Sequence, residues 1–134
     1  MGHILVAYDG SEAAVKVLSH ASGLAEPTDE LIVLYVIPSV GLQEFAEIDA
    51  GETIHNANDI VNKAFMELRT KKIQAIGVVR RGNVADEIVK IGLEMDCGLI
   101  VLGYKGVSRI GPFKLGNIAE KVTKIAKRPV LIVR

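Results

Sequence analysis

Hydrophobic residues gather into five short runs along the chain, at residues 3–8, 31–37, 73–79, 99–102 and 130–133. Four of these runs are continuous rather than alternating, which is typical of parallel strands that are covered on both faces. The third run differs, because Gln74 and Gly77 interrupt it and Arg80 and Arg81 follow it. The pattern predicts five strands, the third of which lies at an edge of the sheet.

Between the runs, apolar residues recur every three or four positions, as on the buried face of an amphipathic helix. Four such stripes are present: Ala13, Ala14, Val17, Leu18, Ala21 and Leu24; Ile54, Ala57, Val61, Ala64, Phe65 and Leu68; Ala85, Ile88, Val89 and Gly92; and Ile118, Ala119, Val122, Ile125 and Ala126. The polar residues beside the last stripe, such as Lys121 and Lys124, are expected to face solvent. Strands that alternate with helices predict right-handed crossovers, and hence one α/β domain over residues 1–134 with an open parallel sheet and helices on both faces.

Two connecting segments, 38–51 and 104–115, are longer than a compact domain needs. Each follows the carboxyl end of a predicted strand, which is the edge at which open α/β sheets bind their ligands. We therefore expect a binding site at this edge. Gly82 and Asn83, which follow the third run, are expected to form a turn and a helix cap, with a weaker contact to the same ligand.

Charge and composition narrow the class of ligand. The 16 basic and 16 acidic residues cancel, so the chain has no long-range field that would attract nucleic acid or an anionic membrane. No apolar run approaches the ~20 residues that a membrane span requires. The single cysteine, Cys97, excludes an internal disulfide and has no histidine partner nearby, so we expect an inert thiol and a cytoplasmic protein. The three histidines lack the spacing of metal ligands, and we expect no metal held by side chains.

The segment after the fourth run carries the chemistry of an anion site. Gly103 and Gly106 lie where the run ends, and Gly116 and Asn117 open the next helix. Glycine lets a bulky anion touch the backbone, and a helix start offers unpaired N–H groups at a positive dipole end. Three cations occur in the same loop: Lys105, Arg109 and Lys114. A polyphosphate suits this loop; the alternative is that it is an ordinary connection in which Asn117 merely caps the helix.

The glycine spacing resembles the signature of the universal stress protein family, in which Gly, two residues, Gly, nine residues, and Gly followed by Ser or Thr bind the phosphates of ATP. Four further segments are similar to the same family: ILVAYDGSE at 4–12, LYVIP at 34–38, LIVLG at 99–103 and RPVLIVR at 128–134. The resemblance covers essentially the whole chain. The sequence departs from the family at Asn117, where Ser or Thr is usual, and at Gly98, where an aspartate often begins the fourth strand.

The resemblance implies a Rossmann-like sheet of the adenine nucleotide alpha hydrolase type, with strand order 3-2-1-4-5, and ATP as the ligand, with any Mg²⁺ held by its phosphates. It places these residues at the nucleotide: Ala7, Tyr8, Asp9, Val36, Leu102, Gly103, Gly106, Gly116, Asn117 and Ile118. Asp9 would accept hydrogen bonds from the ribose; the alternative is that it caps a helix, a role that Ser11 could fill. The backbone of Val36, beside Ala7, would read the adenine edge; both residues also suit a strand core. Lys105, Arg109 and Lys114 are weaker candidates.

Three functions remain open at this point. The first is an ATP-binding regulatory or stress-response module with an unidentified protein partner. The second is a weak ATPase or nucleotidyl-transfer enzyme, which the lack of a clear general base disfavours. The third is a relative that has lost nucleotide binding and acts through protein contacts. The run from Val130 to Val133 has no interior charge and would lie at a sheet edge in the family's strand order, so we also expect a homodimer through this strand.

Overall fold

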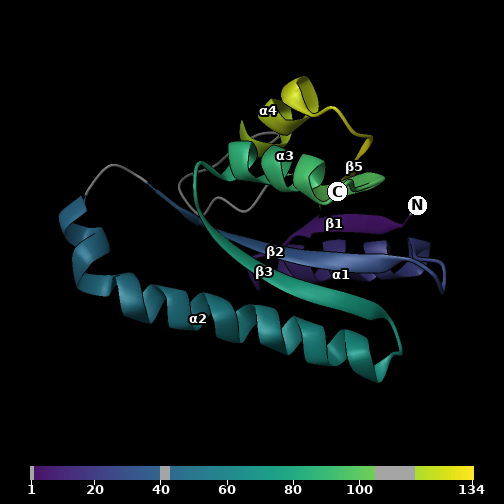
Figure 1. Cartoon of the computed structure of the whole chain (residues 1–134), viewed down its shortest axis with the longest axis horizontal. Helices are drawn as coiled ribbons and strands as arrows, with labels where there is room; N and C mark the ends of the chain where they lie inside the picture. The colour runs from purple at the N-terminus through teal and green to yellow at the C-terminus, as the bar shows by residue number, and fades with distance from the viewer. Residues whose placement is uncertain (1, 40–42, 105–116) are drawn as a thin grey trace.

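Five parallel strands form the centre of the molecule, in the order β3-β2-β1-β4-β5 (Figure 1). The computed structural model describes residues 2–39, 43–104 and 117–134, and for residues 43–53 it describes the backbone alone. The strands are β1 (His3–Ala7), β2 (Glu30–Pro38), β3 (Gln74–Gly82), β4 (Leu99–Gly103) and β5 (Val130–Val133). The strand order and the edge positions of β3 and β5 confirm the sequence predictions.

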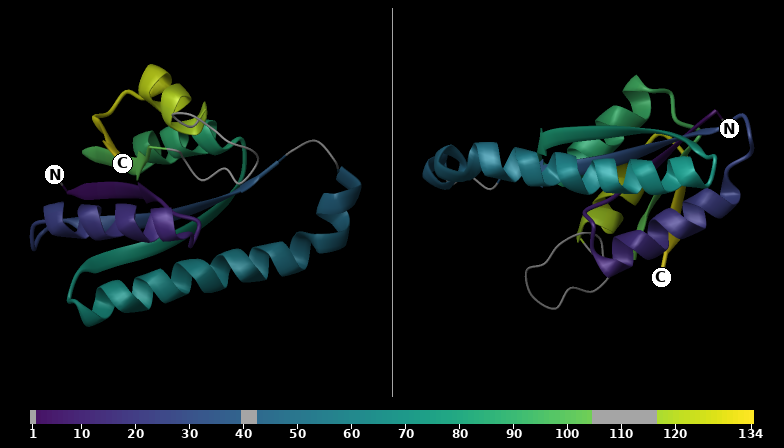
Figure 2. Two further views of the ribbon diagram at one scale, coloured as in Figure 1. Left: turned by 180° about the vertical axis from the view of Figure 1, so that it is seen from behind. Right: turned by 90° about the horizontal axis from the view of Figure 1, so that it is seen from below.

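Four helices cover the two faces of the sheet: α1 (Glu12–Leu24), α2 (Gln43–Thr70), α3 (Val84–Glu94) and α4 (Asn117–Ile125). Helices α1 and α2 lie on one side of the sheet, and α3 and α4 lie on the other (Figures 1 and 2). Each strand therefore sends alternate side chains into two different cores.

The two cores share the central strands. Ile4 and Val6 of β1 pack toward α1 and α2, whereas Leu5 packs toward α3 and α4, and all three are fully buried. Because both faces of the strand need apolar side chains, its sequence is a continuous apolar run. The apolar stripes of the helices pack against these strands. Val17 of α1 and Val61 of α2 belong to the first core, and Ile88 of α3 and Val122 of α4 belong to the second. Four stripe members are exposed: Ala13, Leu24 and Ile125 lie at helix ends, and Ile54 lies within α2, before the buried part of its stripe.

The expectation that residues 38–51 form a long loop is wrong from Gln43 onward, where α2 begins. This helix has 28 residues, so it is about 42 Å long, and its first turns project past the strands (Figure 1). The apolar stripe that predicts this helix begins at Ile54, so the sequence pattern did not extend to the earlier turns. Residues 43–50 contain Gln, Glu and Ala, which favour helix without a packing partner.

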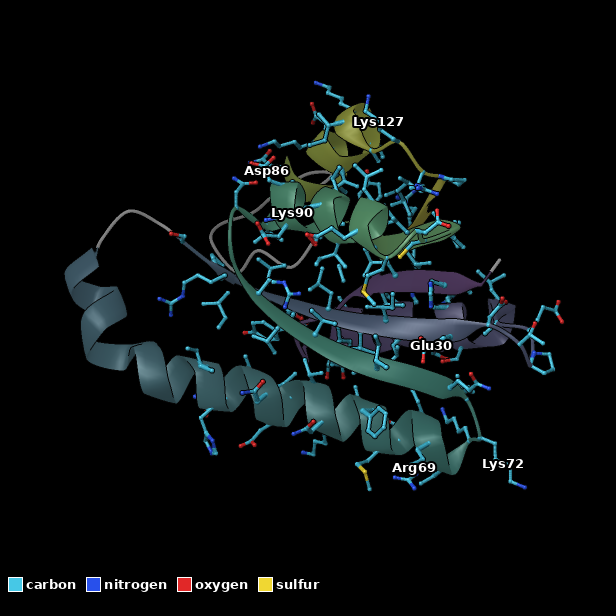
Figure 3. All side chains as sticks on the ribbon, viewed as in Figure 1. Glu30, Arg69, Lys72, Asp86, Lys90 and Lys127 are labelled. Carbon is cyan, nitrogen blue, oxygen red and sulfur yellow. The ribbon has the colours of Figure 1, made fainter. Side chains whose placement is uncertain are left out.

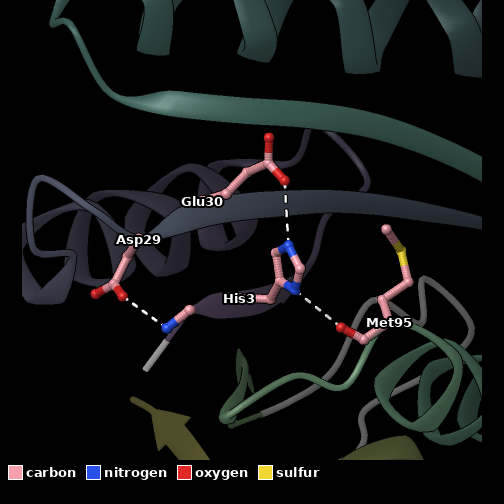
Figure 4. A network of polar contacts seen from close by, with 5 residues as sticks. His3, Asp29, Glu30 and Met95 are labelled. Carbon is pink, nitrogen blue, oxygen red and sulfur yellow. Dashed lines mark hydrogen bonds and ion pairs between the residues drawn. The ribbon is translucent and has the colours of Figure 1, made fainter.

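Polar contacts join the amino ends of the central strands (Figure 4). The backbone N–H of Gly2 donates to Asp29 Oδ1 at 2.8 Å, and His3 Nδ1 donates to the carbonyl oxygen of Met95 at 2.9 Å. His3 Nε2 also lies 3.3 Å from Glu30 Oε1. Hydrogen bonds from the backbone N–H groups of Glu26 and Gly2 hold the pKa of Asp29 below its usual range. These contacts connect β1 with the start of β2 and with the turn that precedes β4.

Gly77 interrupts the apolar pattern of β3 because helix α2 approaches the strand very closely there. A Cβ atom at residue 77 would collide with a γ-methyl group of Val61, which is buried in the core beneath α2. The absence of a side chain at Gly77 is therefore what allows α2 to pack against the edge strand.

We expect Gly77→Ala to lower the free energy of unfolding by about 1–3 kcal/mol, because the new methyl group overpacks the contact with Val61. Urea denaturation measures this change. Adding Val61→Ala should recover part of the loss, so that the double variant is more stable than the sum of the two single effects predicts.

Gly23→Ala is the matched control, since a Cβ atom there meets nothing within 4 Å. The control should be neutral or slightly stabilising, because alanine is a better helix residue than glycine. Equal destabilisation by both glycine substitutions would contradict the close approach of α2 to Gly77.

Candidate functional site

Predicted site residues from four separate segments meet at the carboxyl edge of the sheet. Ala7 ends β1, Val36 lies near the end of β2, and Leu102 lies near the end of β4. All three are buried in the core cluster that faces α3 and α4, and Ile118 in the first turn of α4 packs against the same cluster. The parallel register brings the ends of these strands together, since β1 pairs with β2 on one side and with β4 on the other.

Tyr8 is placed differently from its neighbours. Its side chain is buried in the opposite cluster, toward α1 and α2, and its backbone N–H donates to the carbonyl oxygen of Leu34 at 2.8 Å. Burial, followed by the negative charges of Glu67 and Asp9, raises the pKa of the Tyr8 phenol. The phenol is thus part of the core rather than of the carboxyl-edge surface that Ala7 and Val36 share.

Asp9 is a buried carboxylate immediately beyond β1. Its Oδ1 accepts a hydrogen bond from the backbone N–H of Ser11 at 2.9 Å. Ser11 is the residue that caps α1, because its hydroxyl oxygen accepts from the backbone N–H of Ala14 at 3.2 Å. Between them, Gly10 has φ +83°, a left-handed conformation that glycine adopts without strain. This turn fixes the carboxylate of Asp9 at the carboxyl edge and leaves the capping role to Ser11.

A cleft of about 220 Å³ opens between the ends of β2 and β3 and the starts of α3 and α4. Its lining residues are Pro38, Ser39, Gly82, Asn83, Val84, Ala85, Asn117, Ile118 and Lys121. The cleft thus contains the predicted residues Asn117 and Ile118 together with the weaker candidates Gly82 and Asn83. The wall residues Ser39 and Lys121 were not predicted. The cleft lies on the same side of the sheet as the cluster of Ala7, Val36 and Leu102.

Lys121 links α4 to the amino end of α3 across this cleft. Asn83 caps α3, since its Oδ1 accepts from the backbone N–H of Asp86 at 3.0 Å. Lys121 of α4 places its Nζ 3.0 Å from Asp86 Oδ1 and 3.4 Å from Asn83 Oδ1. The expected cap at Asn83 is therefore present, and Lys121, whose side chain is 44% exposed, also reaches the start of α3. A contact between two helices that are distant in sequence has no periodic signal, and sequence reasoning could not have found it.

Five of the predicted residues lie outside the described part of the chain: Lys105, Gly106, Arg109, Lys114 and Gly116. The ends of the segment that contains them are placed. Gly103 ends β4, and the backbone N–H of Tyr104 donates to the carbonyl oxygen of Val133 at 2.7 Å. The guanidinium of Arg134 lies 4.8 Å from the centre of the Tyr104 ring. The segment therefore leaves β4 beside β5 and re-enters the described structure at Asn117.

A larger hollow, of about 400 Å³, lies at the opposite, amino edge of β2 and β3. Its lining includes Glu30, Arg69 and Lys72, which are labelled in Figure 3, and apolar residues such as Phe65 and Ile73. None of the predicted site residues belongs to it. Size alone therefore does not identify the site, and the convergence of strand ends and helix starts favours the carboxyl edge.

Within the described ranges 2–39, 43–104 and 117–134, no helix is long and apolar enough to cross a membrane. In the same ranges, no group of three or more His, Cys, Asp and Glu side chains is arranged to hold a metal ion.

A model of the universal stress protein family matches residues 1–134. The chain belongs to this family. The universal stress protein YxiE of Bacillus subtilis is 31% identical over an alignment 144 residues long. The match covers 98% of this chain and 97% of YxiE. Among solved structures, the hypothetical protein MJ0577 is similar with a TM-score of 0.86 and 26% identity, covering 98% of this chain and 94% of that one.

A second solved relative is a universal stress protein from Archaeoglobus fulgidus in complex with dAMP. It has a TM-score of 0.78 and 25% identity, and the match covers 100% of this chain and 98% of that one. The family assignment agrees with the five-stranded sheet and with the order of its strands.

Cys97 of this family member is buried beneath α3, away from the carboxyl edge. Burial raises the pKa of its thiol to about 11. At pH 8 the thiolate is therefore scarce, and we expect iodoacetamide to modify the native protein at least ~100-fold more slowly than the protein unfolded in guanidinium.

Mass spectrometry over a time course measures both modification rates. The position of Cys97 would be contradicted by similar rates in the native and unfolded proteins. A circular dichroism spectrum of the reagent-treated native sample controls for unfolding by the reagent itself.

Proposed function

We propose that this protein binds ATP at the carboxyl edge of its sheet and acts as a nucleotide-dependent regulatory module of the stress response. The observation that carries the proposal is the convergence of Ala7, Val36, Leu102 and Ile118, which come from four segments, into one cluster at this edge. The relative from Archaeoglobus fulgidus, in complex with dAMP, supports a nucleotide as the ligand. The cytoplasm is the proposed location, which suits a chain whose one cysteine is a buried thiol.

In this proposal each part of the nucleotide meets a different part of the edge. The adenine lies against the apolar strand ends, where the backbone of Val36 reads its polar edge. The ribose hydroxyls donate to the carboxylate of Asp9, which the Ser11 turn holds in place. The phosphates lie between Gly103 and Asn117, at the positive end of the α4 dipole. In this proposal any Mg²⁺ is held by the phosphates.

ATP serves here as a ligand rather than as a substrate, because the sequence offers no clear general base for activating water. Hydrolysis by the purified protein is then expected to be far below ~1 s⁻¹, which is a slow but ordinary enzyme rate. Turnover at or above that rate would favour the alternative function, a weak ATPase.

We expect purified protein to bind ATP in calorimetry, and to release adenine nucleotide on denaturation if it co-purifies. Gly106→Val and Gly116→Val should abolish the heat of binding, because a branched side chain would block the phosphates from the backbone. Gly23→Val is the control, since a Cβ atom at residue 23 meets nothing within 4 Å and the residue lies in α1. Unchanged ATP affinity in both folded loop variants would rule out phosphate binding by this loop.

Asn117 tests the phosphate position with a smaller change. Asn117→Ser should keep or improve the affinity for ATP, because serine retains a donor and can still cap α4. Asn117→Asp should weaken it by about tenfold or more, because a negative charge then lies beside the phosphates. Asn62→Asp, on an exposed position of α2, is the matched control and should change nothing. Equal affinities for both aspartate variants would mean that residue 117 does not face the ligand.

We also propose that the protein forms a homodimer through the edge of β5. Leu131 is 36% exposed there, and Val130 and Ile132 are half-buried. The carbonyl oxygens of Pro129 and Val133 accept hydrogen bonds from the β4 side. Since the backbone groups of alternate residues point the same way, those of Val130 and Ile132 face the open edge. Antiparallel pairing of two such edges would satisfy these groups in a two-fold interface.

Ile132→Pro should therefore abolish dimerisation in sedimentation while the chain stays folded, because it removes an outward N–H group. Leu131→Pro is the contrast on the same strand: its N–H group faces β4, and its loss should destabilise the fold itself. Thermal unfolding separates the two effects. A wild-type monomer at tens of micromolar, or a folded Ile132→Pro dimer, would exclude this interface.

A further inference from the structure

Lys121 is the charged residue in the wall of the carboxyl-edge cleft. Its neighbours on α4 face elsewhere: Ala119 and Val122 are buried in the core, and Lys124 pairs with Glu120 at 3.2 Å on the solvent side. Lys121 follows Asn117 by four residues, so one helical turn places both on the same face of α4. The ammonium group therefore stands at the cleft into which the first turn of α4 opens.

The present partners of Lys121 are exchangeable. Its side chain is 44% exposed and that of Asp86 is 55% exposed, and exposed ion pairs of this kind contribute little to stability. The second contact, to Asn83 Oδ1 at 3.4 Å, uses an oxygen that also accepts the capping bond from the backbone N–H of Asp86. Withdrawing Lys121 would leave the α3 cap satisfied. The lysine can therefore leave α3 at small cost when a stronger anion enters the cleft.

A phosphate is such an anion. It carries more negative charge than a single carboxylate, and its several oxygens accept charge-assisted hydrogen bonds from an ammonium group. Without Lys121, the carboxylate of Asp86 would repel a phosphate in the cleft, and the acidic side chains of Glu87 and Glu120 in the first turns of α3 and α4 would add to that repulsion. Among the described residues that line the cleft, Lys121 is thus the cation that offsets this repulsion.

We propose that Lys121 is the residue that makes this site select phosphorylated ligands over the uncharged nucleoside. On binding, its ammonium group leaves Asp86 and contacts a phosphate oxygen, while Asp86 remains at the start of α3. The inference rests on the proposed function, since it assigns a role within the same adenine-nucleotide site.

The test compares the affinities of adenosine, AMP, ADP and ATP, measured by calorimetry, for wild type and three variants. Lys121→Gln should weaken ATP binding by about tenfold and change adenosine binding by less than about twofold. Asp86→Asn should strengthen ATP binding about two- to threefold, because Lys121 then loses its competing partner. Lys124→Gln makes the same charge change on the same helix, with its side chain paired to Glu120, and should leave every affinity unchanged.

Salt provides a second readout that a structural role would not move. The dependence of ATP affinity on salt concentration should become shallower in Lys121→Gln and stay as in wild type in Lys124→Gln. ATP binding with unchanged selectivity in Lys121→Gln would overturn the role of Lys121 while leaving the proposed function intact. Equal losses of adenosine and ATP would also overturn it, because they would indicate a damaged cleft. If wild type binds none of the four compounds, the proposed function itself fails, and the role of Lys121 with it.

Discussion

The parallel pairing of β1 with β2 and β4 is the constraint on which the rest of the structure depends. Ile4, Leu5 and Val6 are fully buried, since helices cover both faces of the sheet. Burying a side chain of this size stabilises the fold by about 1.5–3 kcal/mol. Because the strands run in one direction, all of their carboxyl ends reach the same edge. The cores on the two faces therefore also determine which residues gather at the site.

The candidate site combines buried residues at the strand ends with half-exposed charged residues on α3 and α4. Ala7, Val36 and Leu102 belong to the sheet and its core, and their positions cannot change without disturbing the packing of α3 and α4. Lys121 and Asp86, by contrast, are half-exposed and joined by a weak ion pair. The buried strand ends suit contact with a flat apolar group, and the half-exposed charged pair suits contact with a charged group.

The sequence predicted the parts of the fold that follow from local pattern and burial. Continuous apolar runs identified four of the strands because these strands are covered on both faces, and the interrupted run with Gln74, Gly77 and the arginine pair marked β3 as an edge strand. The reason for Gly77 itself, the close approach of Val61, depends on how α2 packs and was not visible in the pattern. The early turns of α2 were missed because the apolar stripe used to predict the helix begins only at Ile54, and these turns project past the strands (Figure 1).

The candidate site, which stays a prediction, follows from the sequence only in part. Residues at strand ends, such as Asp9 and Val36, follow from the rule that ligands bind at the carboxyl edge and from the resemblance to the family. Lys121 was not among the predicted residues because its contacts cross from α4 to α3, and Asp86 lies 35 positions away in the sequence. A charged residue beside an apolar stripe predicts a solvated helix face. Lys121 lies at the cleft only because of how α3 and α4 pack together.

The central claim, that an adenine nucleotide occupies the carboxyl edge, is tested most directly by following backbone amide signals in nuclear magnetic resonance spectra while ATP is added. The account predicts that the shifts concentrate at Ala7, Asp9, Val36, Gly103 and the first turn of α4. Residues at the amino edge should remain unchanged. Shifts confined to the larger hollow, around Glu30, Arg69 and Lys72, would contradict the account.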